Sequence, residues 1–351
     1  MRVGLSLLTL VPGISGGSET YARELVRALA RVGTNEYLAL VPPLARDAGD
    51  GLPTIVAEAY PSSTTTAGRL RAMGSATVRP ARLRSLLTAA DVVHYPLTVP
   101  LPRPEGPHVL TLLDVQHLDL PQLFSRGERH FRKLAYDRAS RRATEVIVIS
   151  EFVRERVVER LGLDPAHVHA VWLGVDHARF TPAPDVEREP LLLYPARPWP
   201  HKNHARLLEA FHEVRRTRPE LRLLLTGVGH DPSTLPEGVE ARSVSGDELI
   251  ELYRRAACLV FPSLYEGFGL PPIEAMACGC PVAAASAGSL PEVCGDAAVL
   301  FDPHDPEAIA AGVEEALTRT AELSERGRRR AAVFTWDETA RAHDRVYARL
   351  S

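Results

Sequence analysis

Two carboxylates eight positions apart, Glu266 and Glu274, flank a segment whose residue types suit a ligand rich in hydroxyls. Gly267 and Gly269 allow a tight turn and a close approach of the backbone to a ligand, which residues with a Cβ resist. The pair Pro271–Pro272 suits the opening of a helix, where a missing N–H costs nothing. We therefore expect Glu274 in or near a first helical turn and Glu266 in the loop before it, both accepting hydrogen bonds beside free backbone N–H groups.

This segment predicts a site for a sugar or a ribose, and its N–H groups suit a phosphate. A plainer alternative also fits the segment taken alone. It is a loop with one exposed Glu, followed by a helix whose N-terminus favours another acid for its dipole. The rest of the chain has to decide between the two.

A basic segment, residues 197–203, follows an expected strand and precedes an expected helix. Only Lys133 and Lys202 are lysines among the 41 basic residues, so Lys202 runs against the chain's preference for arginine. A compact ammonium beside the planar guanidinium of Arg197 can neutralise a diphosphate whose charge grows as its bond to a sugar breaks. The alternative is a solvated helix start.

A glycine loop, residues 11–20, joins the first expected strand to the first expected helix. Gly13, Gly16 and Gly17 form a G-x-x-G-G pattern, which departs from the dinucleotide fingerprint and argues against NAD. A flexible turn at a helix N-terminus could accept a diphosphate, and an ordinary strand-to-helix loop is the alternative.

His117 follows another expected strand, where it could contact a ligand or serve as a hydrogen-bonded packing residue. Asp114 and Asp119 lie close by in sequence, but this spacing is too generic to favour a metal site. The run 126–142 mixes cations with aromatic and aliphatic residues. It could meet anionic lipid or an acidic acceptor, or form a solvated helix face.

The whole chain, at 351 residues with 45% hydrophobic and 24% charged residues, fits a soluble protein of two domains. Residues 1–172 carry 21 basic and 17 acidic side chains, and residues 173–351 carry 20 basic and 27 acidic ones. The net charge of neither half suggests nucleic-acid binding. The start of the chain fits a buried strand better than a signal peptide, and no run is apolar enough to span a membrane. All four cysteines lie in the second half and are expected as buried free thiols, which indicates a cytoplasmic protein.

Apolar runs alternate with helical patterns from end to end, which predicts an α/β protein with parallel sheets. The proline- and charge-rich segment 176–190 is the best linker between two similar halves, 1–174 and 175–336, with a last helix, 337–351, that could pack back on the first half. Two doubly wound sheets would face a cleft, with ligands at the carboxyl ends of strands. The expected strands are Val3–Leu10, Tyr37–Val41, Val92–Tyr95, Val109–Leu113, Val146–Ile149, Val168–Trp172, Leu191–Tyr194, Leu221–Thr226, Cys258–Phe261, Val282–Ala285 and Ala298–Phe301. The expected helices include Glu19–Val32, Phe152–Leu161, Asn203–Thr217, Gly246–Ala256, Pro272–Cys278 and Pro306–Thr320.

Taken together, these motifs resemble the retaining glycosyltransferases of family four, which have the GT-B fold. The likeness covers nearly the whole chain, and its C-terminal motifs are the more specific. The residues that carry it are Gly16, Gly17, Ser150-Glu151-Phe152, Gly174-Val175-Asp176, Arg197, Lys202, Glu266, Gly267-Phe268-Gly269-Leu270-Pro271, Glu274 and Ala275–Val282.

The resemblance implies a role for each matching residue. Arg197 and Lys202 would hold the donor diphosphate, Glu266 the hydroxyls of the donor sugar, and Glu274 the nucleotide ribose. The backbone N–H groups of Phe268, Gly269 and Leu270 would bind donor sugar and phosphate. His117 would contact the transferred sugar near its reacting carbon. The N-terminal half would bind the acceptor and the C-terminal half the nucleotide.

The implied reaction moves a hexosyl unit, with retention, from a GDP- or UDP-linked sugar to a hydroxyl of a glycan, a lipid-linked or a small-molecule acceptor. Mannose on GDP is the first expectation, from similarity of the 114–124 region to polysaccharide mannosyltransferases and rhamnosyltransferases. No metal or other cofactor is expected, because cations of the protein would stabilise the leaving group. Two alternatives are a nucleotide-sugar epimerase on the same fold and a catalytically silent relative that binds nucleotide sugars. The basic 126–142 run would allow peripheral contact with the inner face of a membrane.

Overall fold

The structure, a computed structural model, describes residues 1–14, 16–78, 80–183 and 186–350. These residues form two compact units, and each is described by itself. Unit 1 is made of Met1–Gly174 with Trp336–Ser351, and unit 2 is made of Val175–Thr335.

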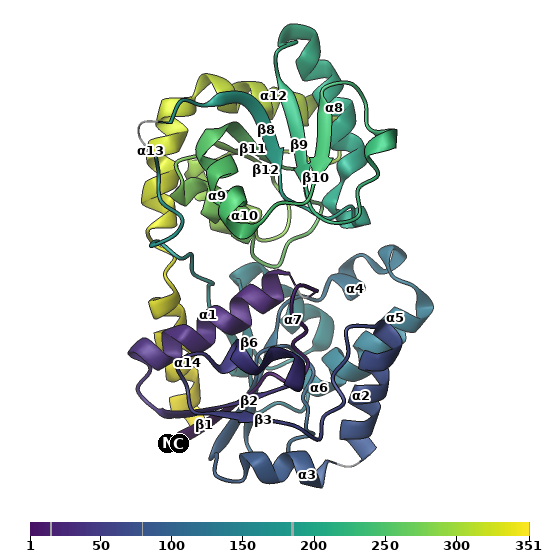
Figure 1. The fold of residues 1–351 in the computed structure, drawn as a ribbon, viewed down its shortest axis with the longest axis vertical. Helices are drawn as coiled ribbons and strands as arrows, with labels where there is room; N and C mark the ends of the chain where they lie inside the picture. Colours follow the sequence, from purple (N-terminus) through teal and green to yellow (C-terminus); the bar gives the residue numbers. More distant parts are fainter. Residues whose placement is uncertain (15, 79, 184–185, 351) are drawn as a thin grey trace. The chain divides into compact units, whose positions relative to one another are not determined.

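Unit 1 contains a seven-stranded sheet in the order β3-β2-β1-β4-β5-β6-β7, in which every pair of neighbouring strands is parallel (Figure 1). Its strands are β1 Arg2–Ser6, β2 Glu36–Val41, β3 Thr54–Val56, β4 Val92–Tyr95, β5 His108–Leu112, β6 Glu145–Val148 and β7 Val168–Ala170. Its helices are α1 Gly17–Val32, α2 Thr66–Val78, α3 Ala81–Arg84, α4 Gln116–Asp119, α5 Arg126–Arg132, α6 Arg138–Ser140, α7 Glu151–Leu161 and α14 Trp336–Tyr347, with a π-helical turn at Lys133–Asp137 and a final 3-10 turn at Ala348–Leu350.

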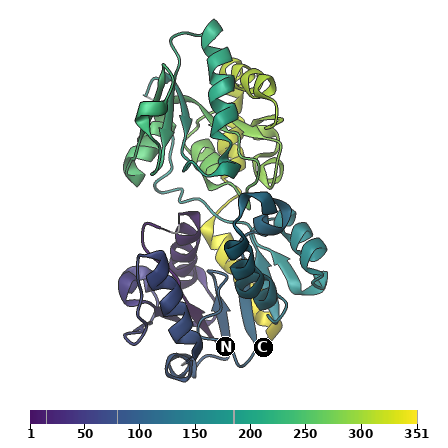
Figure 2. The same cartoon turned by 90° about the vertical axis from the view of Figure 1, so that its right-hand side faces the viewer.

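Unit 2 contains a six-stranded parallel sheet in the order β10-β9-β8-β11-β12-β13, with helices on both faces (Figure 2). Its strands are β8 Glu189–Tyr194, β9 Arg222–Thr226, β10 Val239–Arg242, β11 Ala256–Phe261, β12 Val282–Ala285 and β13 Val299–Phe301. Its helices are α8 His204–Thr217, α9 Gly246–Arg255, α10 Leu270–Ala277, α11 Leu290–Cys294, α12 Pro306–Thr318 and α13 Thr320–Ala331, with a 3-10 turn at Pro200–Lys202.

These two doubly wound units confirm the predicted α/β class. The apolar runs became strands because a parallel sheet covered by helices buries both faces of its inner strands, as in the fully buried Glu145–Val148. Strands β3 and β10 were not predicted, because both are edge strands with mixed burial and no continuous apolar run. Helix α13 was also missed, since only Leu323, Gly327 and Ala331 of its twelve residues are buried.

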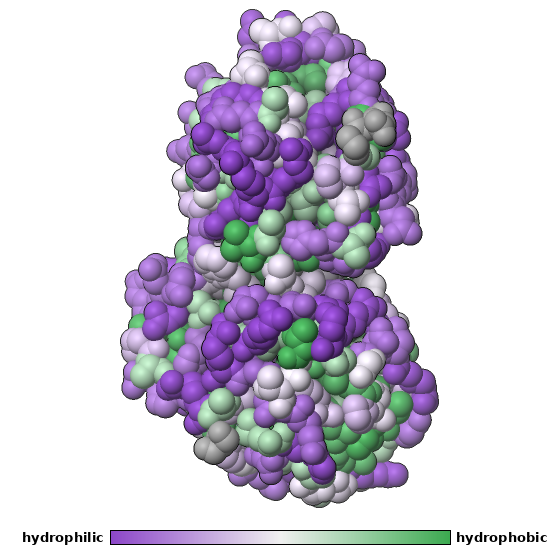
Figure 3. All heavy atoms as spheres, turned by 90° about the vertical axis from the view of Figure 1, so that its left-hand side faces the viewer, coloured by the Kyte–Doolittle hydropathy of each residue, from purple (hydrophilic) through white to green (hydrophobic). Residues whose placement is uncertain are grey.

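On the face drawn in Figure 3, hydrophilic residues cover most of each unit and hydrophobic ones gather in smaller groups. All four cysteines are free and buried, as expected. In the described ranges no helix combines the length and the apolar content needed to cross a bilayer.

The C-terminal helix α14 packs against α1 of unit 1, where a buried polar network holds it. Tyr21 Oη lies 2.8 Å from both Thr111 Oγ1 and His343 Nε2, and Tyr347 Oη lies 2.7 Å from His94 Nδ1. Burial lowers the pKa of His343 to about 4 and the pKa of His94 well below its usual value. The network is therefore built for neutral imidazoles.

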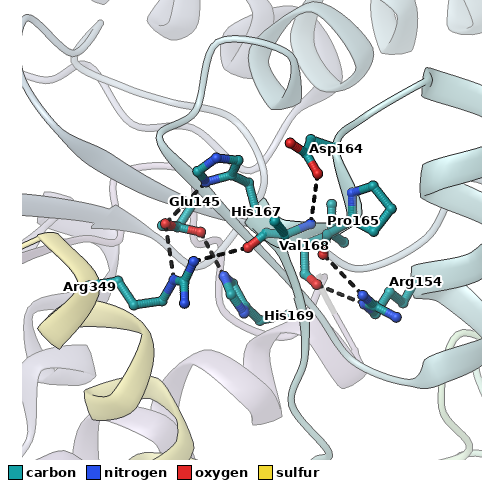
Figure 4. Close-up of polar contacts among 9 residues, drawn as sticks. Glu145, Arg154, Asp164, Pro165, His167, Val168, His169 and Arg349 are labelled. Atoms are coloured by element: carbon teal, nitrogen blue, oxygen red, sulfur yellow. Dashed lines mark hydrogen bonds and ion pairs between the residues drawn. The ribbon is translucent and has the colours of Figure 1, made fainter.

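A second cluster fastens the end of the chain to the sheet (Figure 4). Glu145 begins β6 with a side chain only 4% exposed, and it accepts hydrogen bonds from His169 Nε2 at 2.6 Å and from His167 Nδ1 and Arg349 Nε at 3.2 Å. Burial by itself would raise the pKa of Glu145, but these three hydrogen bonds outweigh it and lower the pKa. Because Glu145 lies at the amino end of its strand, opposite the edge where such sheets bind ligands, its role is structural.

Candidate functional site

The C-terminal predicted site residues lie in unit 2, mainly in the loops after β8 and β11. These two strands are neighbours in the sheet, and the chain continues from β8 to β9 on one side and from β11 to β12 on the other. The strand order thus reverses between β8 and β11. Ligands of open α/β sheets bind at such switch points, outside the carboxyl ends of the strands.

Lys202 and Glu266 contact each other between these two loops. Lys202 Nζ lies 2.5 Å from Glu266 Oε1, and each side chain is 14% exposed. The ammonium also lies 5.4 Å from the centroid of the Phe261 ring, within the range of a cation–π contact. The pair sets a cation for an anionic ligand group beside an acceptor for hydroxyls. Arg197 belongs to the same loop as Lys202, with its guanidinium 5.8 Å from the Trp199 ring.

Asn203 fixes the loop that carries Lys202. Its backbone is left-handed, with φ 61°, and its side chain is buried. Asn203 Nδ2 donates to Pro262 O at 3.1 Å and to Pro303 O at 2.7 Å, in the loops after β11 and β13. Leu264 N also donates to His201 O at 2.8 Å. The position of Lys202 relative to Glu266 is therefore set by backbone and amide contacts.

The loop after β12 contacts the turn that follows Glu266 and fixes its position. Ser289 is fully buried and its Oγ donates to Phe268 O at 2.7 Å. Gly288 has φ 61°, and a Cβ there would lie 2.7 Å from Glu266 N. The Phe268 ring packs edge-to-face on Phe334, 5.7 Å between centroids, and Phe268 as a whole is 3% exposed.

Helix α10 begins at Leu270, two residues before the expected Pro272, because Gly269 with φ 112° serves as its N-cap. A Cβ on Gly269 would also lie 2.9 Å from Leu290 Cδ2. Glu274 is the fifth residue of the helix, next to its first turn. Its Oε2 accepts a hydrogen bond from Tyr253 Oη at 3.1 Å, and burial raises the pKa of Glu274 to about 7. This carboxyl is easily protonated until a ligand supplies further donors.

The glycine loop lies in unit 1 at the carboxyl end of β1. Gly16 is the N-cap of α1 with φ 53°, and Gly17 is the first residue of that helix. Glu19 Oε2 accepts a hydrogen bond from Gly13 N at 2.8 Å, which ties the loop to the helix. A Cβ on Gly16 would meet no atom within 4 Å, so its backbone angle, not crowding, favours glycine.

His117 also lies in unit 1, in the short helix α4 after β5. It is 3% exposed, and its Nε2 lies 2.8 Å from Asp137 Oδ1. Its Nδ1 is buried and has no hydrogen-bond partner among the described residues. Asp114 bonds Arg132 and Asp119 bonds Arg156, so both nearby acids have cationic partners. Within the described ranges no group of His, Cys, Asp and Glu is arranged to hold a metal ion.

The predicted residues therefore form two sets, one in each unit. Lys202 and Glu266 touch, Arg197 and the 268–270 turn belong to the same loops, and Glu274 contacts Tyr253 in α9. Gly16, Gly17 and His117 make the second set. The sequence reading missed the supporting residues Asn203, Tyr253, Gly288, Ser289 and Asp137. An Asn directly after the lysine and a Gly-Ser pair separated from β12 by two residues were the available signals for three of them.

Known protein families match both halves of the chain. Residues 15–179 match the family described as Glycosyltransferase Family 4, and residues 179–333 match Glycosyl transferases group 1. Over 226 residues the chain is 33% identical to the MMP alpha-(1->4)-mannosyltransferase of Mycolicibacterium hassiacum, covering 60% of this chain and 55% of that protein. Over 255 residues it is 29% identical to the O-antigen chain mannosyltransferase B of Escherichia coli, covering 65% and 67%. The match thus spans little more than half of the first relative.

Solved structures share the fold at low identity. The sucrose-phosphate synthase of Thermosynechococcus elongatus superposes with a TM-score of 0.78 at 22% identity, covering 100% of this chain and 99% of that one. The Anabaena protein HepE, solved with UDP and glucose, superposes with a TM-score of 0.74 at 16% identity, covering 99% and 100%. The two parallel-sheet units therefore have the GT-B fold.

Proposed function

We propose that this chain, whose two halves match the glycosyltransferase families described above, moves a hexosyl unit from a nucleotide diphosphate sugar to an acceptor hydroxyl with retention of anomeric configuration. The observation that carries the proposal is the 2.5 Å contact of Lys202 Nζ with Glu266 Oε1 at the switch point of unit 2. The contact lies in the half that matches the group 1 glycosyl transferases. Unit 2 accordingly binds the nucleotide and unit 1 the acceptor.

The donor contacts follow from the chemistry of each group. Lys202 and Arg197 bind the diphosphate, and Glu266 accepts hydrogen bonds from sugar hydroxyls once the diphosphate competes for the ammonium. Glu274, beyond the turn, accepts from the ribose hydroxyls. The backbone N–H groups of residues 268–270 bind the sugar and phosphate, which is supported by their place at the N-terminus of α10.

In unit 1, the glycine loop and His117 are a second set of proposed ligand-binding residues. Gly16 and Gly17 give an open turn at the start of α1 that suits the diphosphate or the reaction centre beside it. His117 contacts the transferred sugar. Its buried Nδ1, without a partner among the described residues, is the observation that supports a ligand there.

The proposed reaction needs no nucleophilic side chain. The bond from the anomeric carbon to the leaving phosphate oxygen breaks while the acceptor oxygen bonds to that carbon on the same face. The acceptor's proton passes to the leaving diphosphate. Lys202 and Arg197 stabilise the charge that grows on that leaving group, and no metal or other cofactor takes part.

A mannosyl donor carried by GDP is the first choice, supported by the two relatives named as mannosyltransferases. A UDP-hexose is the second, supported by the HepE structure with UDP and glucose. The acceptor is a hydroxyl of a glycan, of a lipid-linked molecule or of a small molecule. The transferase itself is cytoplasmic. A nucleotide-sugar epimerase would instead release an isomerised donor, and a silent relative would bind donor without turnover.

The proposal includes a peripheral membrane contact through the 126–142 run. Arg126, Arg129 and Lys133 are exposed there, and Leu134 is 49% exposed, so the run presents both cations and an accessible apolar side chain. Co-sedimentation with vesicles of mixed zwitterionic and anionic lipid should retain the protein at low salt. Equal partition to purely zwitterionic vesicles would contradict this part.

A thermal-shift screen of nucleotide sugars tests the proposed donor site. A true donor at 100 times its dissociation constant should stabilise the protein by about 2.7 kcal/mol, whereas the bare sugar should not. Donors that raise the melting temperature are then incubated with and without acceptors, and the nucleoside diphosphate is quantified. Equal shifts from all nucleotides, or none, would contradict a selective donor site.

A further inference from the structure

His117 is paired with a buried carboxylate, Asp137. His117 and Asp137 are 3% and 4% exposed, and His117 Nε2 lies 2.8 Å from Asp137 Oδ1. They come from different elements, α4 and the π-helical turn Lys133–Asp137. An ordinary α-helical turn would place the last side chain of that segment elsewhere, and π-turns are frequent at functional sites.

The imidazole is also fixed by its aromatic neighbours. The rings of Phe124 and Tyr136 pack edge-to-face on His117, at 6.4 and 6.1 Å between centroids. Arg132 covers both of these rings, with its guanidinium carbon 4.7 Å from the Phe124 centroid and 5.1 Å from the Tyr136 centroid. Arg132 in turn bonds Asp114 at 3.1 Å. Rotation of the imidazole is therefore restricted on several sides.

The Asp137 carboxylate decides which nitrogen of a neutral His117 carries the proton. An ionised carboxylate only accepts hydrogen bonds, so Nε2 must be the N–H donor toward Asp137. Nδ1 is then left as a bare acceptor, buried and without a partner among the described residues. A buried acceptor of this kind costs free energy unless a ligand or water satisfies it.

We propose that Asp137 is a positioning residue that holds His117 with Nδ1 as an acceptor for a hydroxyl of the substrate. The inference rests on the proposed function and deepens it, because it names a hydroxyl donor as the group that His117 takes. That hydroxyl belongs either to the hexosyl unit of the donor or to the acceptor.

The first test measures the tautomer directly. In the full-length protein labelled with ¹⁵N-histidine, the His117 signals are assigned by their loss in His117→Gln. Wild type should show a protonated Nε2 and an unprotonated Nδ1, and Asp137→Asn should shift the balance. An unprotonated Nε2 in wild type would overturn the proposal. This readout needs no turnover, so it stands even where the proposed glycosyl transfer fails.

The second test separates positioning from a structural role. Asp137→Asn should lower kcat about 10- to 100-fold, while binding of the nucleoside diphosphate alone to unit 2 stays unchanged. In a His117→Gln background the same change should have no further effect, because Asp137 acts through His117. Asp137→Glu should restore part of the loss. Additive losses in the double variant, or wild-type kcat in Asp137→Asn, would overturn the inference.

The two hydroxyl sources give different outcomes. A donor hydroxyl predicts that Asp137→Asn also slows donor hydrolysis in the absence of acceptor. An acceptor hydroxyl predicts unchanged donor hydrolysis and a raised KM for the acceptor. A melting temperature close to wild type confirms that the variant is folded. If Asp137→Asn does not fold, His117→Gln with the intact Asp137 takes its place, and unchanged kinetics there would equally refute the assignment.

Discussion

Lowering the pH from 8 to 6 should weaken binding of the nucleotide sugar, because Glu274 must be ionised to accept hydrogen bonds from both ribose hydroxyls. Burial raises the pKa of this carboxyl to about 7 in the free protein. The sign follows from linkage: a ligand that binds the carboxylate drives off the proton, so affinity is full above this pKa and falls below it. Between pH 8 and pH 6 the ionised fraction drops about tenfold, and the affinity should drop about tenfold with it.

Isothermal titration of the donor at several pH values measures this effect. A nucleoside diphosphate sugar is the better ligand, since its diphosphate has no free terminal phosphate to titrate in this range. Near pH 7, titrations in buffers of different ionisation enthalpy should report release of about half a proton per ligand bound. Wild type should bind about tenfold more weakly at pH 6 than at pH 8.

Glu274→Gln is the matched control, because it keeps the size of the side chain and removes its titration. Its affinity should be lower than that of wild type at pH 8 and nearly independent of pH. Two results would refute the reasoning. One is an equal wild-type affinity at pH 6 and pH 8, and the other is a pH dependence that Glu274→Gln retains.

Three further changes have defined outcomes. Lys202→Ala should lower kcat about 100-fold or more, because one preorganised cation is lost. Arg216→Ala, on an exposed helix surface, is the control and should leave kcat unchanged. Wild-type turnover in Lys202→Ala would contradict the role assigned to Lys202. Gly288→Ala should cost about 1–3 kcal/mol in chemical denaturation and also reduce turnover, since its φ is 61° and its Cβ would press on Glu266 N. Burial lowers the pKa of His343 to about 4, so this imidazole stays neutral in the folded protein. In the unfolded chain it takes up a proton below its ordinary pKa near 6.5. The free energy of unfolding should therefore be highest above this value and fall by about 2 kcal/mol between pH 7 and pH 5. His343→Gln should remove that share of the acid sensitivity.

The inner strands were predictable because burial on both faces of a parallel sheet demands continuous apolar runs. The edge strands β3 and β10 are not buried on both faces and so have no continuous apolar run. The polar helix α13 buries only three residues, so its sequence has little of the apolar periodicity that indicates a packed helix. Loop positions such as Gly269 were readable because a left-handed turn before a proline-rich helix start leaves glycine as the favoured residue.

The candidate site was predictable where its chemistry is local in sequence, as in Arg197 with Lys202 and in the Glu266–Glu274 segment. Its supports were not, because they act over long separations. Asn203 contacts Pro303 one hundred positions away, and Asp137 reaches His117 from twenty positions away. An Asn directly after the lysine indicates a supporting residue but does not identify its distant partner, and an Asp in a basic helical run gives no such indication.

The measurement that tests the central claim most directly is analysis of the products formed from an α-linked nucleotide sugar and a hydroxyl acceptor. Retaining glycosyl transfer predicts one nucleoside diphosphate released for each new glycosidic bond, and an α configuration at the transferred anomeric carbon in the proton NMR spectrum. A β-linked product would contradict retention. An isomerised donor without released nucleoside diphosphate would contradict glycosyl transfer itself.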